Sequence, residues 1–300
     1  MEIAVSTSIA GLLRTVSLSE ALDTITQAGF QKVDFPLSVF SRPKDSPLKR
    51  DHWLSWVRAL REELDRRGLS VTQAHASWEQ AIAEDFSFED PYPVYARTIV
   101  ACRMLGCQKL VFHAPLYFFP TEDQAARRRV TDWNIRWFTQ LVPLLEENGV
   151  TACIENTFDY RRVRRPQDPP FIYTSGHDMY ELAEGIHSPC VKLCLDTGHA
   201  NIAGQDVPQM IRDYGSYLEV LHLNDNLGLI GPVYEDLHLF PGHGTLHWDA
   251  IFKTLREENF TGVFNLEPVD ALSISSPALK VLQFESAKKT VTLLAQEAGY

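Results

Sequence analysis

Four side chains able to bind a metal ion or to transfer a proton stand at the ends of four apolar segments. Glu155 follows Val-Thr-Ala-Cys-Ile, Asp196 follows Val-Lys-Leu-Cys-Leu, His222 ends Val-Leu-His, and Glu267 follows Val-Phe-Asn-Leu. If these segments are neighbouring strands, the four groups converge, and carboxylates brought together in a buried site repel one another. One divalent cation is the simplest compensation, and this set suits Mn²⁺, Co²⁺, Mg²⁺ or Zn²⁺ without choosing among them. A hydrogen-bonded polar network without metal is the alternative.

Three further histidines stand where they would reach the same site. His75 and His113 end two earlier apolar segments, and His199 follows Asp196 by three residues. We expect these histidines to contact the substrate. For His75 and His113, a hydrogen-bonded structural histidine is an equally ordinary interpretation.

Residues of the connecting segments are secondary candidates. Trp78 would offer an aromatic face to a bound ligand, with ordinary core packing as the alternative. Asp236 and His238 form an Asp-x-His pair that would add metal or substrate contacts. Arg161 and Arg162 begin a compact basic run that would hold a phosphate or a carboxylate, with a solvated loop as the alternative.

The elements that must position these groups follow from an alternation along the whole chain. Short apolar runs rich in β-branched residues alternate with longer amphipathic stretches, which is typical of βα units and a parallel sheet. Ser17 and Glu20 have the spacing of a helix capping box, and Gly68 and Gly149 are placed to end helices. The predicted strands cover residues 3–7, 32–36, 70–75, 109–113, 150–155, 191–196, 219–223 and 262–267.

Eight consecutive units without a change of composition favour a single (β/α)8 barrel of the α/β class, as one domain over residues 1–300, rather than a doubly wound sheet with a second domain. The longest irregular segments, about 114–123, 156–177 and 224–248, each follow a predicted strand. In a barrel they would lie at the carboxyl ends of the strands, where active sites are built.

Composition limits the classes of partner. The 300 residues carry 28 Lys and Arg against 39 Asp and Glu, a net charge of −11, which argues against a uniformly basic nucleic-acid surface but does not exclude a local basic cleft. The N-terminus lacks the pattern of a signal peptide, and no apolar run is long enough to span a membrane. The five cysteines are an odd number, and four of them stand in apolar patterns that fit reduced core residues. We therefore expect a cytoplasmic protein, with homo-oligomerisation left open.

Several motifs together resemble one known family. They are Leu195-Asp-Thr-Gly-His-Ala-Asn201 with Ala203-Gly204, then His222-Leu-Asn-Asp225, Asp236-Leu-His238, Pro241-Gly-x-Gly-x-x-x-Trp248 and Leu266-Glu267-Pro. In this order and spacing they resemble the sugar phosphate isomerase/epimerase superfamily of xylose isomerase-like TIM barrels. The resemblance implies a metal held by Glu155, Asp196, His222 and Glu267, with the two glutamates as acid and base and His199 on a substrate oxygen.

This resemblance leads to three functional hypotheses. The first is an isomerase or epimerase of a sugar or keto-sugar, in which proton transfer passes through a metal-stabilised enediolate. A keto-sugar dehydratase or β-eliminase would share its first step. The third is a multi-zinc phosphodiesterase, because the superfamily includes endonuclease IV-type apurinic/apyrimidinic endonucleases, and His75, His113, His199, Asp236 and His238 match their additional ligand types.

Two features depart from the nuclease pattern, one a single residue and the other a pair. Those nucleases prefer a small side chain such as Cys or Ser where this chain has Gly198, and a Ser-Lys pair where it has Asn226 and Leu227. Gly198 and the Pro-Gly-x-Gly segment look more like the sugar enzymes. Within that segment, however, His243 and His247 stand where Glu and Asp are common, so the particular sugar is left open.

Overall fold

Eight parallel strands form a closed barrel. The structure is a computed structural model that describes residues 3–7, 17–41, 46–77, 92–115, 123–158, 171–228, 236–267 and 276–300. Neighbouring strands pair in chain order, and β1 also pairs with β8. They are β1 (Ile3–Ser6), β2 (Lys32–Phe35), β3 (Ser70–His75), β4 (Lys109–His113), β5 (Thr151–Glu155), β6 (Val191–Asp196), β7 (Leu218–Leu223) and β8 (Val263–Leu266). The predicted (β/α)8 fold is confirmed, and every strand boundary lies within one residue of its prediction.

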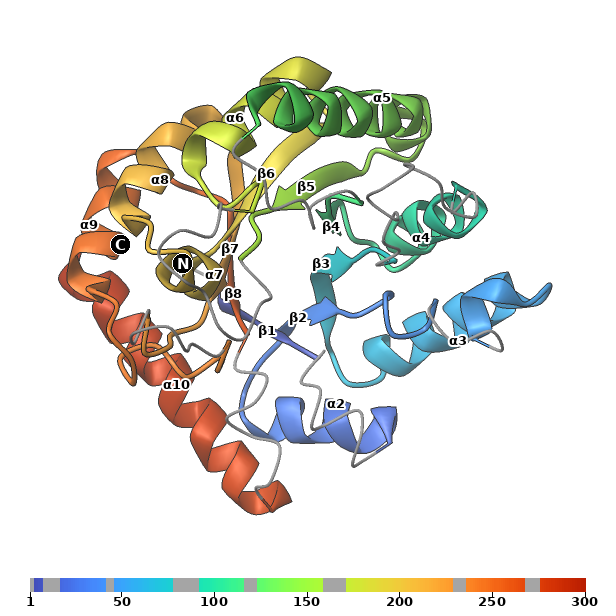
Figure 1. Cartoon of the computed structure of the whole chain (residues 1–300). Coiled ribbons are helices and arrows are strands. Elements are labelled where there is room, and N and C mark those ends of the chain that lie inside the picture. The colour runs from blue at the N-terminus through green and yellow to red at the C-terminus, as the bar shows by residue number, and fades with distance from the viewer. Residues whose placement is uncertain are drawn as a thin grey trace.

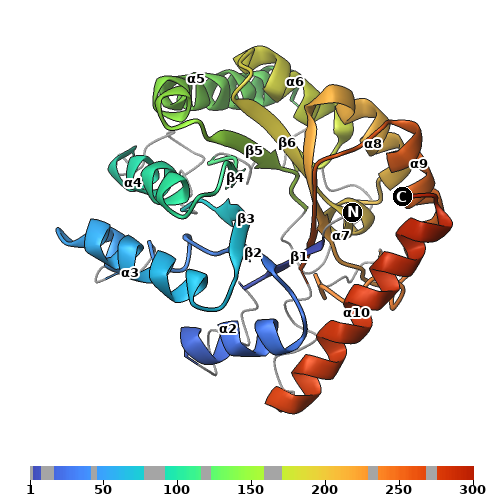
Figure 2. The same ribbon diagram turned by 180° about the vertical axis from the view of Figure 1, so that it is seen from behind.

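Helices surround the barrel as an outer ring, seen from both sides in Figures 1 and 2. The last helix contacts both its predecessor and α2, so the ring closes as the sheet does. The α-helices are α2 (Leu18–Gln27), α3 (Trp53–Asp65), α4 (Tyr92–Met104), α5 (Gln124–Asn148), α6 (Gly176–Ile186), α7 (Thr197–Ile202), α8 (Val207–Tyr214), α9 (Trp248–Glu257) and α10 (Pro277–Glu297). Two 3₁₀ turns, η1 (Pro47–Lys49) and η2 (Gly215–Tyr217), complete the described elements.

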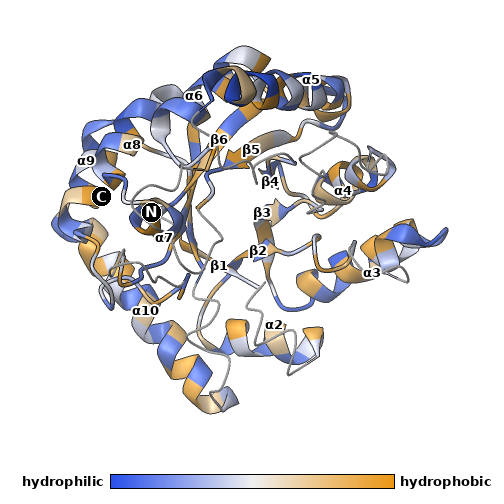
Figure 3. Ribbon diagram, in the orientation of Figure 1, coloured by the Kyte–Doolittle hydropathy of each residue, from blue (hydrophilic) through white to orange (hydrophobic). Residues whose placement is uncertain are grey.

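Local sequence accounts for these helices. Hydrophilic and hydrophobic segments alternate along α3, α5 and α10 in Figure 3, as expected for helices with one buried face. The capping box predicted from Ser17 and Glu20 is present at the start of α2. Gly149 ends α5 in the left-handed conformation, at φ 61°. Among the described residues, none of the helices has the length and apolar character needed to cross a membrane.

A layer of small apolar side chains supports the carboxyl-terminal ends of the strands from within the barrel. Its members come one each from β4 to β8: Val111, Cys153, Cys194, Val220 and Val263. On β4 to β7 each of these residues precedes the polar group at the strand end by two positions, and on β8 by four. Because side chains alternate between the two faces of a strand, each lies on the same face as that polar group. All five cysteines are free and four are buried, as expected for core thiols.

Candidate metal centre

The strands bring the four predicted ligands together. Asp196 on β6 pairs in register with His222 on β7, and Glu155 and Glu267 stand on and just after the flanking strands β5 and β8. The Nδ1 atom of His222 lies 2.9 Å from Oε2 of Glu267, 3.1 Å from Oε1 of Glu155 and 3.9 Å from Oδ2 of Asp196. One ligand atom from each of the four residues lies within 4.8 Å of the others.

The chemistry of this cluster fits a divalent cation. Asp196 and His222 are fully buried, and Glu155 and Glu267 are 2% and 7% exposed. Three carboxylates are therefore confined around one imidazole where water screens their repulsion poorly. Moreover, Oε2 of Glu155 is buried without a hydrogen-bond partner among the described residues. A cation bound here would satisfy that oxygen and offset the negative charge.

The carboxyl groups of the cluster respond differently to their surroundings. Burial opposes ionisation of Glu267, but the charge and hydrogen bond of His222 lower its pKa to about 2. Burial is the largest influence on Asp196 and raises its pKa, although His199 opposes it. Asp196 Oδ2 accepts a hydrogen bond from Asn224 Nδ2 at 2.8 Å, and Oδ1 accepts one from the backbone of His199 at 2.7 Å. The carboxylates are thus held in fixed orientations.

His75 enters the site from β3. Its Nε2 lies 3.9 Å from Glu155 Oε2 and 3.9 Å from Glu267 Oε1. Its Nδ1 lies 3.0 Å from Oδ1 of Asp34, whose Oδ2 accepts from the Ser6 hydroxyl at 2.9 Å. Burial disfavours the charged ring, but Asp34 outweighs it and raises the pKa of His75. His75 is therefore fixed with one nitrogen toward the two glutamates, as its predicted place in the site requires.

Two further groups of predicted residues flank the centre. On one side, His113 Nε2 lies 3.3 Å from Glu155 Oε2, and burial lowers the pKa of His113 to about 4. On the other side, His199 Nε2 and His238 Nε2 lie 3.5 and 2.8 Å from Asp236 Oδ2. Burial opposes protonation of His199, yet Asp196 and Asp236 raise its pKa to about 10. Every predicted polar site residue that the structure describes is thus within reach of the cluster.

Some predicted residues lie outside the described part of the chain. Trp78, Arg161 and Arg162 are among them, as are residues 116–122, 159–170 and 229–235 of the three predicted loops. The described ends of those loops, such as 156–158 and 224–228, follow β5 and β7 at the same end of the barrel as the cluster. The roles of the three residues remain predictions.

We compared the chain with known protein families and with curated proteins. The family model described as xylose isomerase-like TIM barrel matches residues 22–284. The chain belongs to this family. A D-psicose 3-epimerase from Enterocloster bolteae is 28% identical over 219 residues, covering 70% of this chain and 65% of the epimerase, so the chain spans just under two thirds of that relative.

Several solved structures share the fold over nearly the whole chain. A structure described as a D-tagatose 3-epimerase-like protein has a TM-score of 0.72 and 18% identity, covering 99% of both chains. Another, the IOLI protein with a bound zinc atom, has a TM-score of 0.69 and 18% identity, covering 99% of this chain and 98% of that one. Family and relatives confirm the predicted class, an isomerase- or epimerase-like enzyme.

Three polar residues that contact the cluster were not predicted from the sequence. Asp34 lies inside the β2 run Lys-Val-Asp-Phe, and the rule that selected Glu155, a carboxylate in a buried apolar strand, applies equally to it. Gln73 and Asn224 are fully buried beside His222 and Asp196. These contacts join residues that are far apart in the sequence, so no local sequence pattern predicts the contacts.

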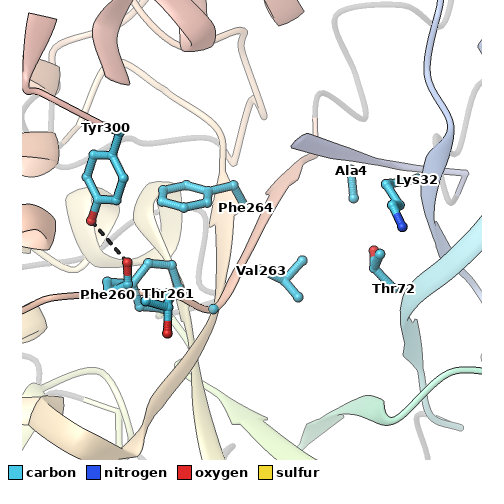
Figure 4. Close-up of a pocket in the computed structure, with 9 residues that line it drawn as sticks. Ala4, Lys32, Thr72, Phe260, Thr261, Val263, Phe264 and Tyr300 are labelled. Carbon is cyan, nitrogen blue, oxygen red and sulfur yellow. Dashed lines mark hydrogen bonds between the residues drawn. The ribbon is translucent and has the colours of Figure 1, made fainter. Parts of the chain in front are cut away.

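A separate pocket opens at the other end of the barrel. It is lined by Ala4, Lys32, Thr72, Val263 and Tyr300 among others, which Figure 4 shows around the starts of β2 and β8. Lys32 and Val263 are the first residues of their strands, whereas the polar cluster stands at the strand ends. This pocket contains none of the predicted site residues.

Proposed function

We propose that this chain is a divalent-metal-dependent isomerase or epimerase of a small sugar or keto-sugar, with Glu155 and Glu267 as the acid–base pair. The metal would be held by Glu155, Asp196, His222 and Glu267. A bound divalent cation would polarise the substrate carbonyl and stabilise the negative charge of an enediolate. The zinc atom bound in the related IOLI structure and the names of the epimerase relatives support this proposal. Cytoplasmic location and a homo-oligomeric state stay predictions.

The observation that carries the proposal is the arrangement of the two glutamates. Each places one oxygen at His222 Nδ1, at 3.1 and 2.9 Å, and its other oxygen 3.9 Å from His75 Nε2. Because β5 and β8 are separated by two strands, the carboxyl groups approach from different sides of the barrel mouth. Two carboxyl groups on opposite sides of a carbon are what epimerisation needs.

The protons then move as follows. One glutamate, ionised, takes the proton from the carbon next to the carbonyl, and the C–H electron pair forms the enediolate. The other, protonated, returns a proton to the opposite face of that carbon for epimerisation. For isomerisation, the proton returns to the former carbonyl carbon, and the proton of the neighbouring hydroxyl passes to the former carbonyl oxygen, so that the carbonyl and hydroxyl groups exchange places. His199 would donate a hydrogen bond to a substrate oxygen, since its Nδ1 is already bonded to the Asn156 carbonyl at 3.0 Å. Elimination of water from the same enediolate would give the dehydratase instead.

Exchange of substrate hydrogen with solvent tests the acid–base pair. We expect the cation-loaded protein to incorporate deuterium from D₂O beside the carbonyl of a ketose from a panel of hexuloses and pentuloses. Glu155→Gln and Glu267→Gln should each lower the rate at least about 100-fold, because an amide cannot exchange the proton. Glu219→Gln, at the other end of β7 and paired with Lys109, is the matched control and should keep the rate. Exchange that survives both substitutions would show that other groups move the proton.

A second candidate, an endonuclease IV-like phosphodiesterase, is favoured by one observation. Among the described residues, four possible ligand groups overlap: His75, His113 and Glu155; His75, His222 and Glu267; Glu155, Asp196, His222 and Glu267; and Asp196, His199 and His238. Such a chain of sites would suit several zinc ions, which in phosphodiester hydrolysis activate water and neutralise charge. Gly198 and the Asn226-Leu227 pair, which depart from the nuclease pattern, weigh against it.

Elemental analysis combined with an abasic-DNA assay separates the two candidates. The isomerase predicts about one tightly held divalent ion per chain and no cleavage of an abasic duplex. Two or three zinc ions per chain with cleavage that His113→Ala removes would establish the hydrolase instead. The control is His177→Ala, which removes an exposed histidine on α6 that lies beside Glu181 and belongs to none of the ligand groups above.

A further inference from the structure

A glutamine inside the barrel contacts the far side of the histidine ligand. Nε2 of Gln73, on β3, lies 2.8 Å from Nε2 of His222, on β7, and both residues are fully buried. The Oε1 atom of the same glutamine is buried without a hydrogen-bond partner among the described residues. The contact spans 149 positions of the sequence and joins strands that do not pair.

The two nitrogens of His222 have different tasks. Nδ1 faces Glu267 and Glu155, so this nitrogen is the one that would bind the cation. A metal ion takes the lone pair of a neutral imidazole, whose proton then sits on the other nitrogen. In the metal-bound form His222 Nε2 is therefore an N–H donor, and it needs an acceptor in a fully buried position.

Gln73 can supply that acceptor without changing its place. A half-turn of its terminal torsion exchanges the amide nitrogen and oxygen within nearly the same space. The unpartnered Oε1 would then face His222 Nε2–H. In the structure, the Gln73 amide nitrogen instead faces His222 Nε2 and donates to it. This contact suits the other tautomer of His222, in which Nδ1 carries the proton and donates it toward Glu267.

We infer that Gln73 is a positioning residue for the metal centre: its amide oxygen accepts the hydrogen bond of His222 Nε2–H and holds Nδ1 toward the cation. This inference rests on the metal site of the proposed function. Cys194 also hydrogen-bonds His222, but a thiol is a weak acceptor. Gln73 is therefore the side chain suited to select the tautomer.

Zinc affinity is the first test, measured by competition with a fluorescent chelator on the full chain. Gln73→Leu removes the acceptor and should weaken Zn²⁺ binding about 10- to 100-fold, the usual effect of losing such a partner. Gln73→Glu keeps an acceptor, so its Zn²⁺ affinity should be no more than about 3-fold weaker than that of the wild type. If Gln73 only filled space, Gln73→Glu would not restore the affinity that Gln73→Leu loses.

Two control variants separate this role from general loss of packing. Asn134→Leu replaces another fully buried amide, which donates to the Tyr173 hydroxyl at 2.8 Å, and should leave zinc affinity unchanged. Cys194→Ala removes the sulfur beside His222 and should change affinity less than Gln73→Leu does. Unchanged affinity in Gln73→Leu, or a larger loss in Cys194→Ala, would overturn the inference.

The wild-type protein offers a second test that needs no variant at residue 73. Long-range ¹H–¹⁵N spectra of histidine-labelled, Zn²⁺-loaded protein should show His222 protonated at Nε2 and zinc-bound at Nδ1, with the ring assigned through His222→Gln. The opposite tautomer, or no zinc binding at all, would refute the inference. Zinc binding with the expected tautomer but without solvent exchange into any ketose would instead count against the proposed reaction and leave the role of Gln73 standing.

Discussion

Because Gly198 has no side chain, the side chain of Asn224 can pack directly against it and contact Asp196. A Cβ atom built at this position would overlap Oδ1 of Asn224, whose Nδ2 donates to Asp196 Oδ2 at 2.8 Å. A serine or cysteine at 198 would therefore displace the amide that orients a predicted ligand. This conflict gives a physical reason for the glycine, and it separates the arrangement in this chain from a site built with Cys or Ser there.

Substituting this glycine tests the relation directly. Gly198→Ala should destabilise the fold by about 1–3 kcal/mol through overpacking and should weaken Mn²⁺ binding, because Asn224 must release Asp196. Urea unfolding and a manganese titration measure the two effects. Gly149→Ala is a suitable control, since nothing lies within 4 Å of its added Cβ and only the positive φ of 61° is strained. Manganese affinity that is equal in both variants would contradict the proposed link.

At the scale of elements, the strands were predictable and the contacts between them were not. Apolar β-branched runs mark buried parallel strands, and a carboxylate at such a run's end, as in Glu155 or Asp196, is a local signal. The barrel then places those ends side by side. The contacts of Gln73 with His222 and of Asp34 with His75 cross the barrel interior, and their register depends on the closed sheet rather than on local spacing.

One carboxylate organises the described residues 236–248 against the end of β7. Asp225, fully buried, accepts hydrogen bonds from Trp248 Nε1 at 2.8 Å and from the backbone of Gly242 and Leu246 at 3.1 and 3.2 Å. A Cβ at Gly244 would overlap its Oδ1. The Asp225 and Pro-Gly-x-Gly motifs are thus parts of one folded unit, which explains their occurrence together in the sequence.

Replacing this carboxylate should loosen the whole unit. Asp225→Asn keeps the shape but turns an NH₂ group toward N–H donors, so we expect a loss of about 3 kcal/mol in the free energy of unfolding, measured in urea. Asp249→Asn, an exposed carboxylate in the first turn of α9, should cost less than about 1 kcal/mol. Comparable losses in both variants would show that the hydrogen bonds of Asp225 do not organise this segment.

At the scale of the whole molecule, the closed sheet brings charges of the same sign together. The chain carries a net charge of −11, and its carboxyl-terminal barrel mouth collects Glu155, Asp196, Asp236 and Glu267. These carboxylates come from segments that are separate in the unfolded chain. A cation that bridges three of them should therefore bind the folded state far better than the unfolded one, and binding should appear as stability.

Thermal unfolding with and without chelator tests this coupling. At a Mn²⁺, Co²⁺ or Zn²⁺ concentration 100-fold above Kd, mass action stabilises the fold by about 2.7 kcal/mol, which should raise Tm by about 5 °C for a chain of this size. Excess EDTA should reverse the shift. Lowering the pH to about 4 should diminish it, because protons compete for the carboxylate and imidazole ligands. Glu155→Gln should lose most of the cation-induced rise in Tm, and Glu219→Gln should keep it. A Tm that none of these cations changes would exclude a metal centre that spans these strands.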